Sequence, residues 1–245
     1  MVQDMTALRE GERTRATAPF PSTFALKLVM AVTGVIFIAF VFVHMIGNLK
    51  VYGGPASLDS YAQWLREVGY PLIPHKGVLW ALRVTLLVSL VAHVGASVIL
   101  WARGRRARGR FRRRRSSGVT AWAARTMLLG GVLILGFLVI HLLDLTIGRA
   151  VAPGAYQPAD ADGTIHAYTN LVASFSRPWM AAVYVVWMLV IAVHIWHGWR
   201  TMAQDLGATG HRLRAVWATL GALIALAIVL GNALIPILVQ LGVIA

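Results

Sequence analysis

The chain has 245 residues, of which 58% are apolar and only 13% are charged, and its mean hydropathy is +0.69. This composition excludes an ordinary soluble domain, in which about 25% of the residues are charged. The sequence contains no cysteine, which excludes disulfides and iron–sulfur clusters held by this chain alone.

Five apolar segments are long enough to cross a membrane as helices. Each holds about 17–24 residues, and at about 1.5 Å per residue such a helix crosses a hydrocarbon core roughly 30 Å thick. The sequence therefore predicts an all-α, five-helix membrane domain over residues 23–245, with spans at about 26–49, 78–101, 122–146, 178–202 and 214–240. Residues 1–22 are polar, contain no signal-peptide core, and are expected to form a disordered tail.

Two connections between the predicted spans carry features of their own. Residues 57–69 are predicted to form an amphipathic helix at the membrane interface, because their apolar side chains recur at helical spacing: Leu58, Tyr61, Trp64, Leu65 and Val68. Residues 148–178 are long, contain Gly, Pro and Asp, and are expected to fold over the outer face of the bundle.

Positive charge is distributed unevenly along the chain. The sequence has 23 Lys and Arg against 9 Asp and Glu, a formal net charge of +14. Grouped by the predicted spans, 17 cations fall on the side of the N-terminus and 6 on the other side. The positive-inside rule therefore predicts a cytoplasmic N-terminus and an extracytoplasmic C-terminus. The arginine run of residues 103–115 adjoins a span, so it is interpreted as a contact to anionic lipid or an acidic partner, not to nucleic acid.

Four of the predicted spans contain histidine: His44, His93, His141 and, in the fourth span, both His194 and His197. An ionisable side chain inside a membrane is costly and is a functional hypothesis by default. A single buried histidine is usually a hydrogen-bonded core residue. Histidines in four different helices are unlikely to occur by chance, and they indicate a common function.

The directions of the spans place these histidines in two layers. At about 1.5 Å per residue, His44 and His141 lie about 27 and 23 Å from the cytoplasmic starts of their helices, toward the outer face. The same estimate places His93 and His194 about 7 Å from the inner face. The two layers are therefore roughly 15 Å apart, and each has one histidine from each of two helices.

Two imidazoles that face each other at one depth suit axial ligation of haem iron. Zinc needs about four ligands in one shell, and a proton relay would add carboxylates at mid-membrane, where only Asp144 comes close. Two haems are therefore the favoured interpretation. His197, three residues after His194 and on roughly the same face, stays open as an alternative ligand or a contact around the haem.

Six short motifs follow one another along the chain: His44-Met-Ile-Gly-Asn-Leu, Ser60-Tyr61-Ala-Gln-Trp-Leu, Leu79-Trp-Ala-Leu-Arg, Val91-Ala-His93, His141-Leu-Leu-Asp144-Leu-Thr and His194-Ile-Trp-His197-Gly-Trp. Together they resemble the cytochrome b membrane subunit of succinate dehydrogenase/fumarate reductase, of the single-subunit, five-helix, di-haem type. The resemblance covers residues from about 22 to 239. The order of the motifs and their placement on four helices make it specific.

The resemblance implies two haem b groups and two partner subunits. The partners are a flavoprotein with FAD and the dicarboxylate site, and an iron–sulfur subunit, both on the cytoplasmic face. It implies that His44 and His141 ligate the outer haem and that His93 and His194 ligate the inner haem. Some relatives carry a glutamate where this chain has Ala192, which puts a proton route through that position in doubt.

A quinone site near the outer haem is also implied by the resemblance, and the di-haem type suggests menaquinone. Quinone reduction needs protons and hydrogen-bond partners for two carbonyl groups. Candidates on that side are Tyr61, Gln63, Glu67, Arg83 and Asp144. Their alternative roles are interface anchoring for the loop residues, and a haem propionate contact or a loop salt bridge for Arg83 and Asp144.

The expected function is electron transfer in respiratory complex II, between the iron–sulfur subunit and quinone, with no catalytic residue assigned to this chain. The direction, succinate oxidation or fumarate reduction, stays open, as does a higher oligomer. The expected location is a prokaryotic cytoplasmic membrane, with lipid as a further partner and no nucleic acid. The alternatives are a di-haem subunit of a formate dehydrogenase, hydrogenase or nitrate reductase, and a haem-free anchor or transporter.

Overall fold

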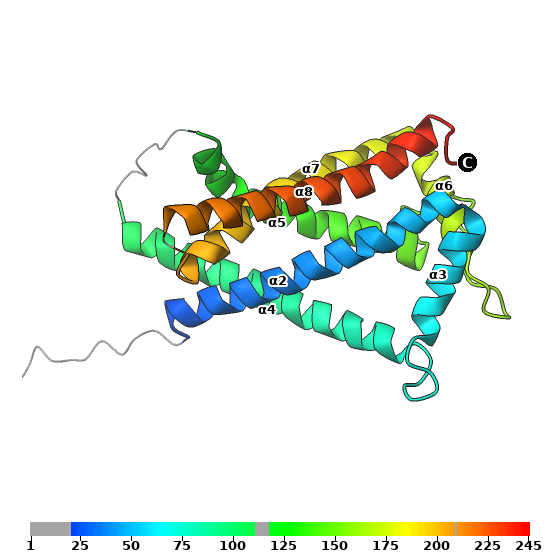
Figure 1. Ribbon diagram of the computed structural model, residues 1–245, viewed down its shortest axis with the longest axis horizontal. Helices are drawn as coiled ribbons and strands as arrows, with labels where there is room; N and C mark the ends of the chain where they lie inside the picture. The colour runs from blue at the N-terminus through cyan, green and yellow to red at the C-terminus, as the bar shows by residue number, and fades with distance from the viewer. Residues whose placement is uncertain (1–20, 111–117, 209) are drawn as a thin grey trace, which may run out of the picture.

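A computed structural model describes residues 21–110, 118–208 and 210–245. Within these ranges the chain is helical and contains no strand, which confirms the predicted all-α fold. Five long helices run back and forth between the two ends of the molecule (Figure 1): α2 (Thr23–Asn48), α4 (Gly77–Arg108), α5 (Val119–His141), α7 (Pro178–Asp205) and α8 (His211–Gln240). Shorter elements connect them: η1 (Leu49–Gly53), α3 (Pro55–Glu67), η2 (Leu142–Ile147) and α6 (Ala167–Phe175).

The five long helices are long and apolar enough to cross a membrane. Their bounds lie close to the predicted spans, except that α4 continues to Arg108, inside the arginine run. Large apolar side chains are exposed along the helices, such as Leu87, Val91, Leu129 and Leu223. A surface of this kind is favourable against lipid and unfavourable against water, so it supports the predicted membrane location.

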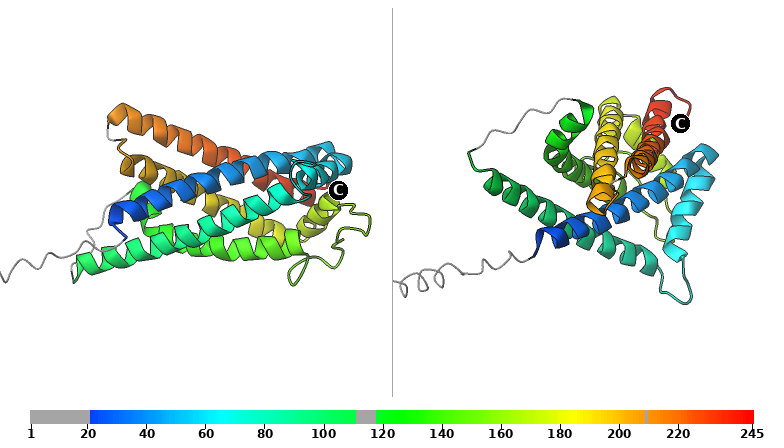
Figure 2. Two further views of the ribbon diagram at one scale, coloured as in Figure 1. Left: turned by 90° about the horizontal axis from the view of Figure 1, so that it is seen from below. Right: turned by 60° about the vertical axis from the view of Figure 1, so that its left-hand side comes forward.

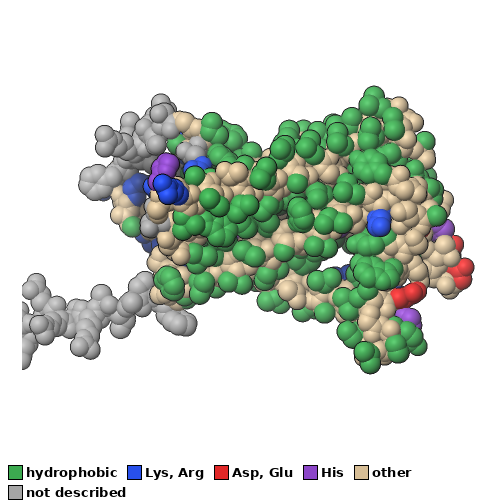
Figure 3. Space-filling view, in the orientation of Figure 1, with side chains coloured by type: hydrophobic (Ala, Val, Ile, Leu, Met, Phe, Trp, Pro, Cys, Tyr) green, Lys and Arg blue, Asp and Glu red, His purple; other side chains and the backbone are tan. Residues whose placement is uncertain are grey.

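The two ends of the bundle differ in the elements that cover them. We call the end with α3 and α6 the loop end, and the end where α4 stops and α8 begins the arginine end (Figures 1 and 2). On the face shown in Figure 3, Lys and Arg side chains gather at the arginine end, and Asp and Glu side chains lie at the loop end. This is the uneven distribution of charge from which the sequence predicts the orientation of the chain.

Hydrogen bonds connect the covering elements of the loop end to the bundle. The backbone amide of Tyr168 in α6 donates to Asp59 Oδ1 in α3 at 2.8 Å. The Tyr168 hydroxyl donates to the carbonyl of Ala245 at 3.1 Å, and Gln240 Nε2 donates to the carbonyl of Phe175 at 2.5 Å. The connection between α5 and α7 therefore folds over this end of the bundle. The helix predicted over residues 57–69 is present, but it begins at Pro55 and ends at Glu67.

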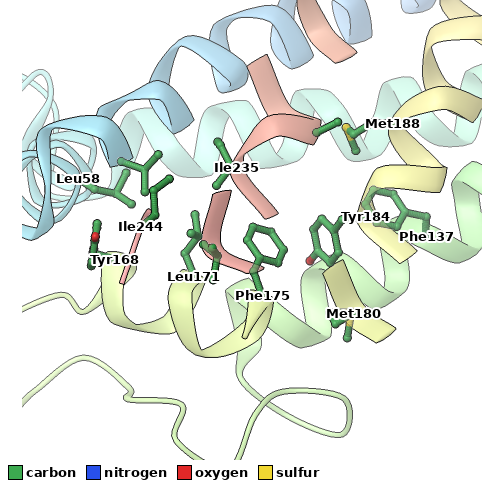
Figure 4. Close-up of a cluster of buried hydrophobic side chains, with 13 residues drawn as sticks. Leu58, Phe137, Tyr168, Leu171, Phe175, Met180, Tyr184, Met188, Ile235 and Ile244 are labelled. Atoms are coloured by element: carbon green, nitrogen blue, oxygen red, sulfur yellow. The ribbon is translucent and has the colours of Figure 1, made fainter. Parts of the chain in front are cut away.

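A cluster of buried side chains fills the loop end of the bundle (Figure 4). Phe137 of α5 and Phe175 of α6 both meet the ring of Tyr184 edge to face, at centroid distances of 5.0 and 4.8 Å. Aromatic pairs favour this geometry. Met180 of α7 and Ile235 of α8 are buried in the same cluster. The cluster fixes α5, α6, α7 and α8 against one another near the end of α5.

Two predictions concern residues outside the described ranges. The predicted tail covers residues 1–22, of which only Pro21 and Ser22 are described. Ser22 caps α2, because its side-chain oxygen accepts a hydrogen bond from the amide of Ala25 at 3.1 Å. Residues 111–115, the last part of the arginine run, also lie outside the described ranges.

Candidate functional site

The first pair of histidines lies near the loop end, between α2 and α5. The ring centroids of His44 and His141 are 5.9 Å apart, and the ring planes stand at 80°. Phe40 stacks on His44 at 5.5 Å, and Phe137 lies 6.0 Å from His141. Both helices run from the arginine end to the loop end (Figure 1), so a histidine one turn before the end of α2 meets the last residue of α5.

A hydrogen-bonded network holds His141 in place. His141 Nδ1 lies 3.3 Å from the Tyr184 hydroxyl, which donates to Asp144 Oδ2 at 3.1 Å. The Ser174 hydroxyl donates to the same carboxylate oxygen at 2.5 Å. Arg177 Nη2 forms a salt bridge with Asp144 Oδ1 at 2.6 Å. The network thus connects the end of α5 to η2, α6 and the start of α7.

The centre of this network is a fully buried carboxylate, since Asp144 is 0% exposed. Burial removes the water that would solvate its charge, so a buried carboxylate needs a countercharge and hydrogen-bond donors. Arg177 supplies the countercharge, and both oxygens of Asp144 accept hydrogen bonds. A salt bridge is one of the alternative roles that the sequence suggested for this residue.

The second pair lies deeper in the bundle, toward the arginine end. His93 of α4 faces α2, where its Nδ1 lies 2.8 Å from Thr33 Oγ1. The Thr33 hydroxyl donates to the carbonyl of Val29 at 2.7 Å. Phe37, one turn farther along α2, meets the His93 ring edge to face at 5.8 Å. The packing of α4 on α2 therefore sets the position of this imidazole.

His194 of α7 is the second member of this pair. It lies close enough to both His93 and His197 to interact with them electrostatically. Its Nδ1 is buried and has no hydrogen-bond partner among the described residues. His197 lies one turn farther along α7, partly buried and beside Arg200. His93 thus interacts electrostatically with His194, whereas the charged group that acts on His197 is Arg200.

Glycines allow the backbones of two other helices to approach the second pair. A Cβ atom added at Gly34 of α2 would lie 3.8 Å from His93 Cε1. A Cβ atom at Gly131 of α5 would lie 3.8 Å from His194 Cε1, and one at Gly130 would lie 4.0 Å from His194 Nδ1. The space beside these imidazoles therefore has just enough room for a methyl group and would be filled by a larger side chain.

The separation of the first pair fits a haem iron held between two imidazoles. Imidazole nitrogen binds metal ions at about 2 Å, so a metal between two rings holds their centroids roughly 6 Å apart. The first pair has nearly this separation. In the second pair, the buried and unpartnered Nδ1 of His194 is a polar atom that a bound group could satisfy.

Four of the five quinone candidates lie on α3 or in the first turns of α4, with the Tyr61 ring against Gly47 of α2. Tyr61, Gln63 and Glu67 are on α3, and Arg83 is in the second turn of α4. Gln63 Nε2 donates to Glu67 Oε1 at 2.6 Å, while Gln63 Oε1 is buried without a partner among the described residues. Asp144 lies apart from these four, in the network beside the first histidine pair.

Arg66, which the sequence did not single out, lies at the junction of α3 and α4. Its guanidinium donates to the carbonyl of Ala62 at 2.5 Å. Burial and, after it, the nearby charge of Arg83 lower the pKa of Arg66, and Tyr156 acts in the opposite direction. No described carboxylate lies within salt-bridge distance of either arginine. Arg83 lies over the ring of Trp80, with its guanidinium carbon 5.1 Å from the ring centroid. Guanidinium groups without a carboxylate partner can donate to an electron-rich oxygen.

Sequence reasoning also missed three residues of the histidine networks, namely Thr33, Tyr184 and Arg177. Thr33 is 60 residues from His93, and Tyr184 is 43 residues from His141. The local signals are weak: Thr33 and Tyr184 are hydroxyl residues inside apolar spans, and Arg177 directly precedes the fourth span. Neither signal predicts a partner, because the contacts depend on how the helices pack.

The five apolar helices define an integral, multi-pass membrane protein. Residues 102–234, from the last turns of α4 into α8, match the family model of the succinate dehydrogenase/fumarate reductase transmembrane subunit, and the chain belongs to this family. The matched region contains one histidine of each pair, His141 and His194. Comparisons with curated proteins and with solved structures found no match.

Proposed function

We propose that this chain is the membrane-anchoring cytochrome b subunit of a succinate:quinone oxidoreductase. In this role it carries electrons through two b haems, between a partner iron–sulfur subunit and membrane quinone. The observation that carries the proposal is the arrangement of four histidines from four helices in two pairs at two depths. The chain also belongs to the family of succinate dehydrogenase/fumarate reductase transmembrane subunits, which supports a role in such a complex.

The proposed ligands are His44 and His141 for one haem, and His93 and His194 for the other. The centroid distance of 5.9 Å supports the first assignment. The closeness of His194 to His93, together with its unpartnered Nδ1, supports His194 over His197 for the second. His197 is then a neighbour of the second haem, on the side of the arginine end.

When bound, each haem would supply a one-electron carrier, which side chains cannot provide. The chain itself holds the imidazoles and packs apolar side chains against them. Phe40 and Phe137 pack on the rings of the first pair, and Phe37 packs on His93. An apolar environment of this kind and the hydrogen bonds to the ligands are the means by which a protein sets a haem potential.

The junction of α3 and α4 is the proposed quinone site. A quinone presents two carbonyl oxygens, which accept hydrogen bonds and become negative on reduction. Arg66 and Arg83 could donate to one of them, and Tyr61 or Gln63 to the other. Glu67 is a proton donor at the surface of this junction. Asp144 is fully buried and already accepts hydrogen bonds at both oxygens, so its proposed role is to hold Tyr184 in place.

The arginine end is the proposed docking face for the partner subunits, and it would face the cytoplasm. The partners are an iron–sulfur subunit and a flavoprotein with FAD, on which the dicarboxylate chemistry takes place. The histidine pair on that side, His93 and His194, would exchange electrons with the iron–sulfur subunit. The pair near the loop end would exchange electrons with quinone, whose proposed site lies at that end.

Two measurements test this function. Affinity purification of the full-length chain from its membranes should recover a flavoprotein and an iron–sulfur protein, and the reduced-minus-oxidised spectrum should show b-type haem. Replacing His44 or His141 by Ala should remove one haem, and replacing His93 or His194 the other. A spectrum without haem would exclude the electron-transfer function. Loss of a haem in His197→Ala but not in His194→Ala would reverse that assignment.

A further inference from the structure

A hydroxyl group lies beside one histidine of each pair. Thr33 Oγ1 is 2.8 Å from His93 Nδ1, and the Tyr184 hydroxyl is 3.3 Å from His141 Nδ1. A hydroxyl has one proton to donate and lone pairs that accept. A neutral imidazole has one protonated and one unprotonated nitrogen. If the hydroxyl donates its proton to another group, the histidine nitrogen beside it must carry the hydrogen and donate to the hydroxyl oxygen. If the hydroxyl donates to the histidine, the hydrogen is on the other ring nitrogen.

The proton of Thr33 has an acceptor other than the histidine. The carbonyl oxygen of Val29 is 2.7 Å from Thr33 Oγ1, and that of Met30 is 3.3 Å away. If Thr33 donated to His93, its oxygen would face the Val29 carbonyl at that short distance with no hydrogen between them, which is repulsive. Both short contacts are favourable only when Thr33 donates to the carbonyl and His93 Nδ1–H donates to Thr33.

The proton of Tyr184 has a carboxylate as its acceptor. The Tyr184 hydroxyl donates to Asp144 Oδ2 at 3.1 Å, and the other oxygen of this carboxylate forms a salt bridge with Arg177 Nη2. Hydrogen bonds to an ionised group are roughly twice as strong as neutral ones. The phenol proton therefore goes to Asp144, and His141 Nδ1–H donates to the phenol oxygen. The ring of Tyr184 cannot turn away easily, because it is buried in the aromatic cluster of the loop end (Figure 4).

We infer that Thr33 and Tyr184 are positioning residues, each of which holds one histidine as the Nδ1–H tautomer and leaves Nε2 as the nitrogen that binds iron. Asp144 acts through Tyr184. This inference rests on the proposed haem ligation, and it adds which nitrogen binds and which side chains orient the ring. Metal-binding histidines commonly donate their other N–H to a carboxylate or carbonyl, which raises the basicity of the ligand.

The two chains of hydrogen bonds end in different groups. From His93 the chain passes through Thr33 to a neutral backbone carbonyl. From His141 it passes through Tyr184 to a carboxylate. The negative charge of Asp144 favours a more electron-rich His141, and an electron-rich ligand stabilises ferric over ferrous iron. The hydroxyl contact therefore lowers the midpoint potential of the haem near the loop end more than that of the other haem.

The effect of each hydroxyl should be confined to one haem. In the described residues, His44 has ring contacts with Phe40 and His141, and His194 has a buried Nδ1 without a partner. Each proposed haem thus has one ligand held by a hydroxyl and one that is not. Removing one hydroxyl leaves the ligands of the other haem as they were.

The test uses the full complex in membranes and measures haem content, spectrum and the midpoint potential of each haem. Tyr184→Phe should raise the midpoint potential of the haem near the loop end and weaken its retention by about 10-fold or more. Thr33→Val should raise the potential of the other haem by a smaller amount. Thr33→Ser keeps the hydroxyl, so it should have the same midpoint potential as the unmodified complex. A purely steric role of Thr33 would not explain such a difference between Thr33→Ser and Thr33→Val.

Two control variants remove hydroxyls that do not contact a histidine. Tyr168→Phe removes a phenol at the loop end that donates to the carbonyl of Ala245. Thr126→Val removes a hydroxyl in α5 that bonds only to carbonyls of its own helix. Both should leave the potentials and the haem content unchanged.

The outcomes separate this inference from the function on which it rests. If the unmodified complex contains no haem, the proposed function fails. If it contains two haems and their potentials are unchanged in both Tyr184→Phe and Thr33→Val, only the inference fails. The inference also fails if either variant shifts both haems equally, or if a control variant shifts a potential as much. If Tyr184→Phe does not assemble, Thr33→Val and Thr33→Ser test the inference. It is supported if their midpoint potentials differ as expected, and it fails if they are equal.

Discussion

The loop end and the arginine end of this bundle place their histidines by different means. At the loop end, His141 is held by a tyrosine, a buried carboxylate and an aromatic cluster from three other elements. Toward the arginine end, His93 is held by a single threonine, and His194 faces two glycines of α5. The histidine near the loop end is thus fixed by side chains. The pair toward the arginine end depends on how closely the helix backbones approach.

This difference predicts different sensitivities to mutation. A site fixed by a charged network is damaged when one member of the network is removed, because the remaining charge has lost its partner. A site fixed by small residues is damaged when a side chain is added, because close-packed interiors have little free space. Variants at Gly131, Asp144 and Gly47 each test one of these mechanisms.

The largest effect is expected from enlarging a glycine beside His194. In Gly131→Leu, the new side chain would occupy the space of the His194 ring, because even a Cβ atom there would be 3.8 Å from His194 Cε1. The expected result is loss of the haem on the arginine side while the other haem is retained, measured by haem content per chain. Gly131→Ala is the matched control and should keep both haems. If Gly131→Leu still contained two haems, the close approach of α5 to His194 would not be needed for haem binding.

The next effect concerns the buried salt bridge at the loop end. Asp144→Ala leaves Arg177 without a countercharge, and the loss should be about 3 kcal/mol of the free energy of unfolding. The measurement is denaturant unfolding in detergent, followed by circular dichroism. The double variant Asp144→Leu with Arg177→Met removes both charges and should recover part of the loss. A cost well below about 1 kcal/mol for Asp144→Ala would mean that Arg177 is stabilised by water.

A smaller effect is expected at Gly47, where α2 meets α3 at the loop end. A Cβ atom added there would be 2.6 Å from the ring of Tyr61, so the ring must move. Gly47→Ala should cost about 1 kcal/mol or more in the free energy of unfolding, and it should slow quinone reduction if Tyr61 belongs to the quinone site. Gly104→Ala is the control, because its Cβ atom would meet nothing within 4 Å. Equal stability of the two variants would contradict the tight packing of this end.

The sequence predicted the helices and the histidine pairs, because both follow from local properties. Long apolar runs define the spans, and a fixed rise per residue converts sequence position into depth. That argument placed His44 with His141 and His93 with His194. In the structure the ring centroids of His44 and His141 are 5.9 Å apart, and His194 interacts electrostatically with both His93 and His197. The existence of α3 was also predictable from the spacing of its apolar residues.

The contacts around the histidines could not be predicted in the same way. Thr33 is one hydroxyl residue in a long apolar run, and nothing in the sequence says that His93 of another helix lies beside it. Asp144 was identified as a candidate. Its partners Ser174 and Arg177 come from the connection between α5 and α7, which has no periodic sequence pattern from which its fold could be predicted. Such contacts depend on the rotation of each helix about its axis, and hydropathy determines that rotation only weakly.

The smallest effect is expected at the arginine end, at the exposed ion pair between Lys27 Nζ and Asp205 Oδ1. The two atoms are 2.6 Å apart, but the Lys27 side chain is 45% exposed, so water and salt screen the pair. Lys27→Ala should therefore cost about 0.2–1 kcal/mol in the free energy of unfolding at low salt, and less at high salt. Lys50→Ala, at an exposed lysine of the loop end, is the control for loss of a cation without a carboxylate partner. A loss in Lys27→Ala as large as that in Asp144→Ala would mean that water and salt do not screen the ion pair between α2 and α7.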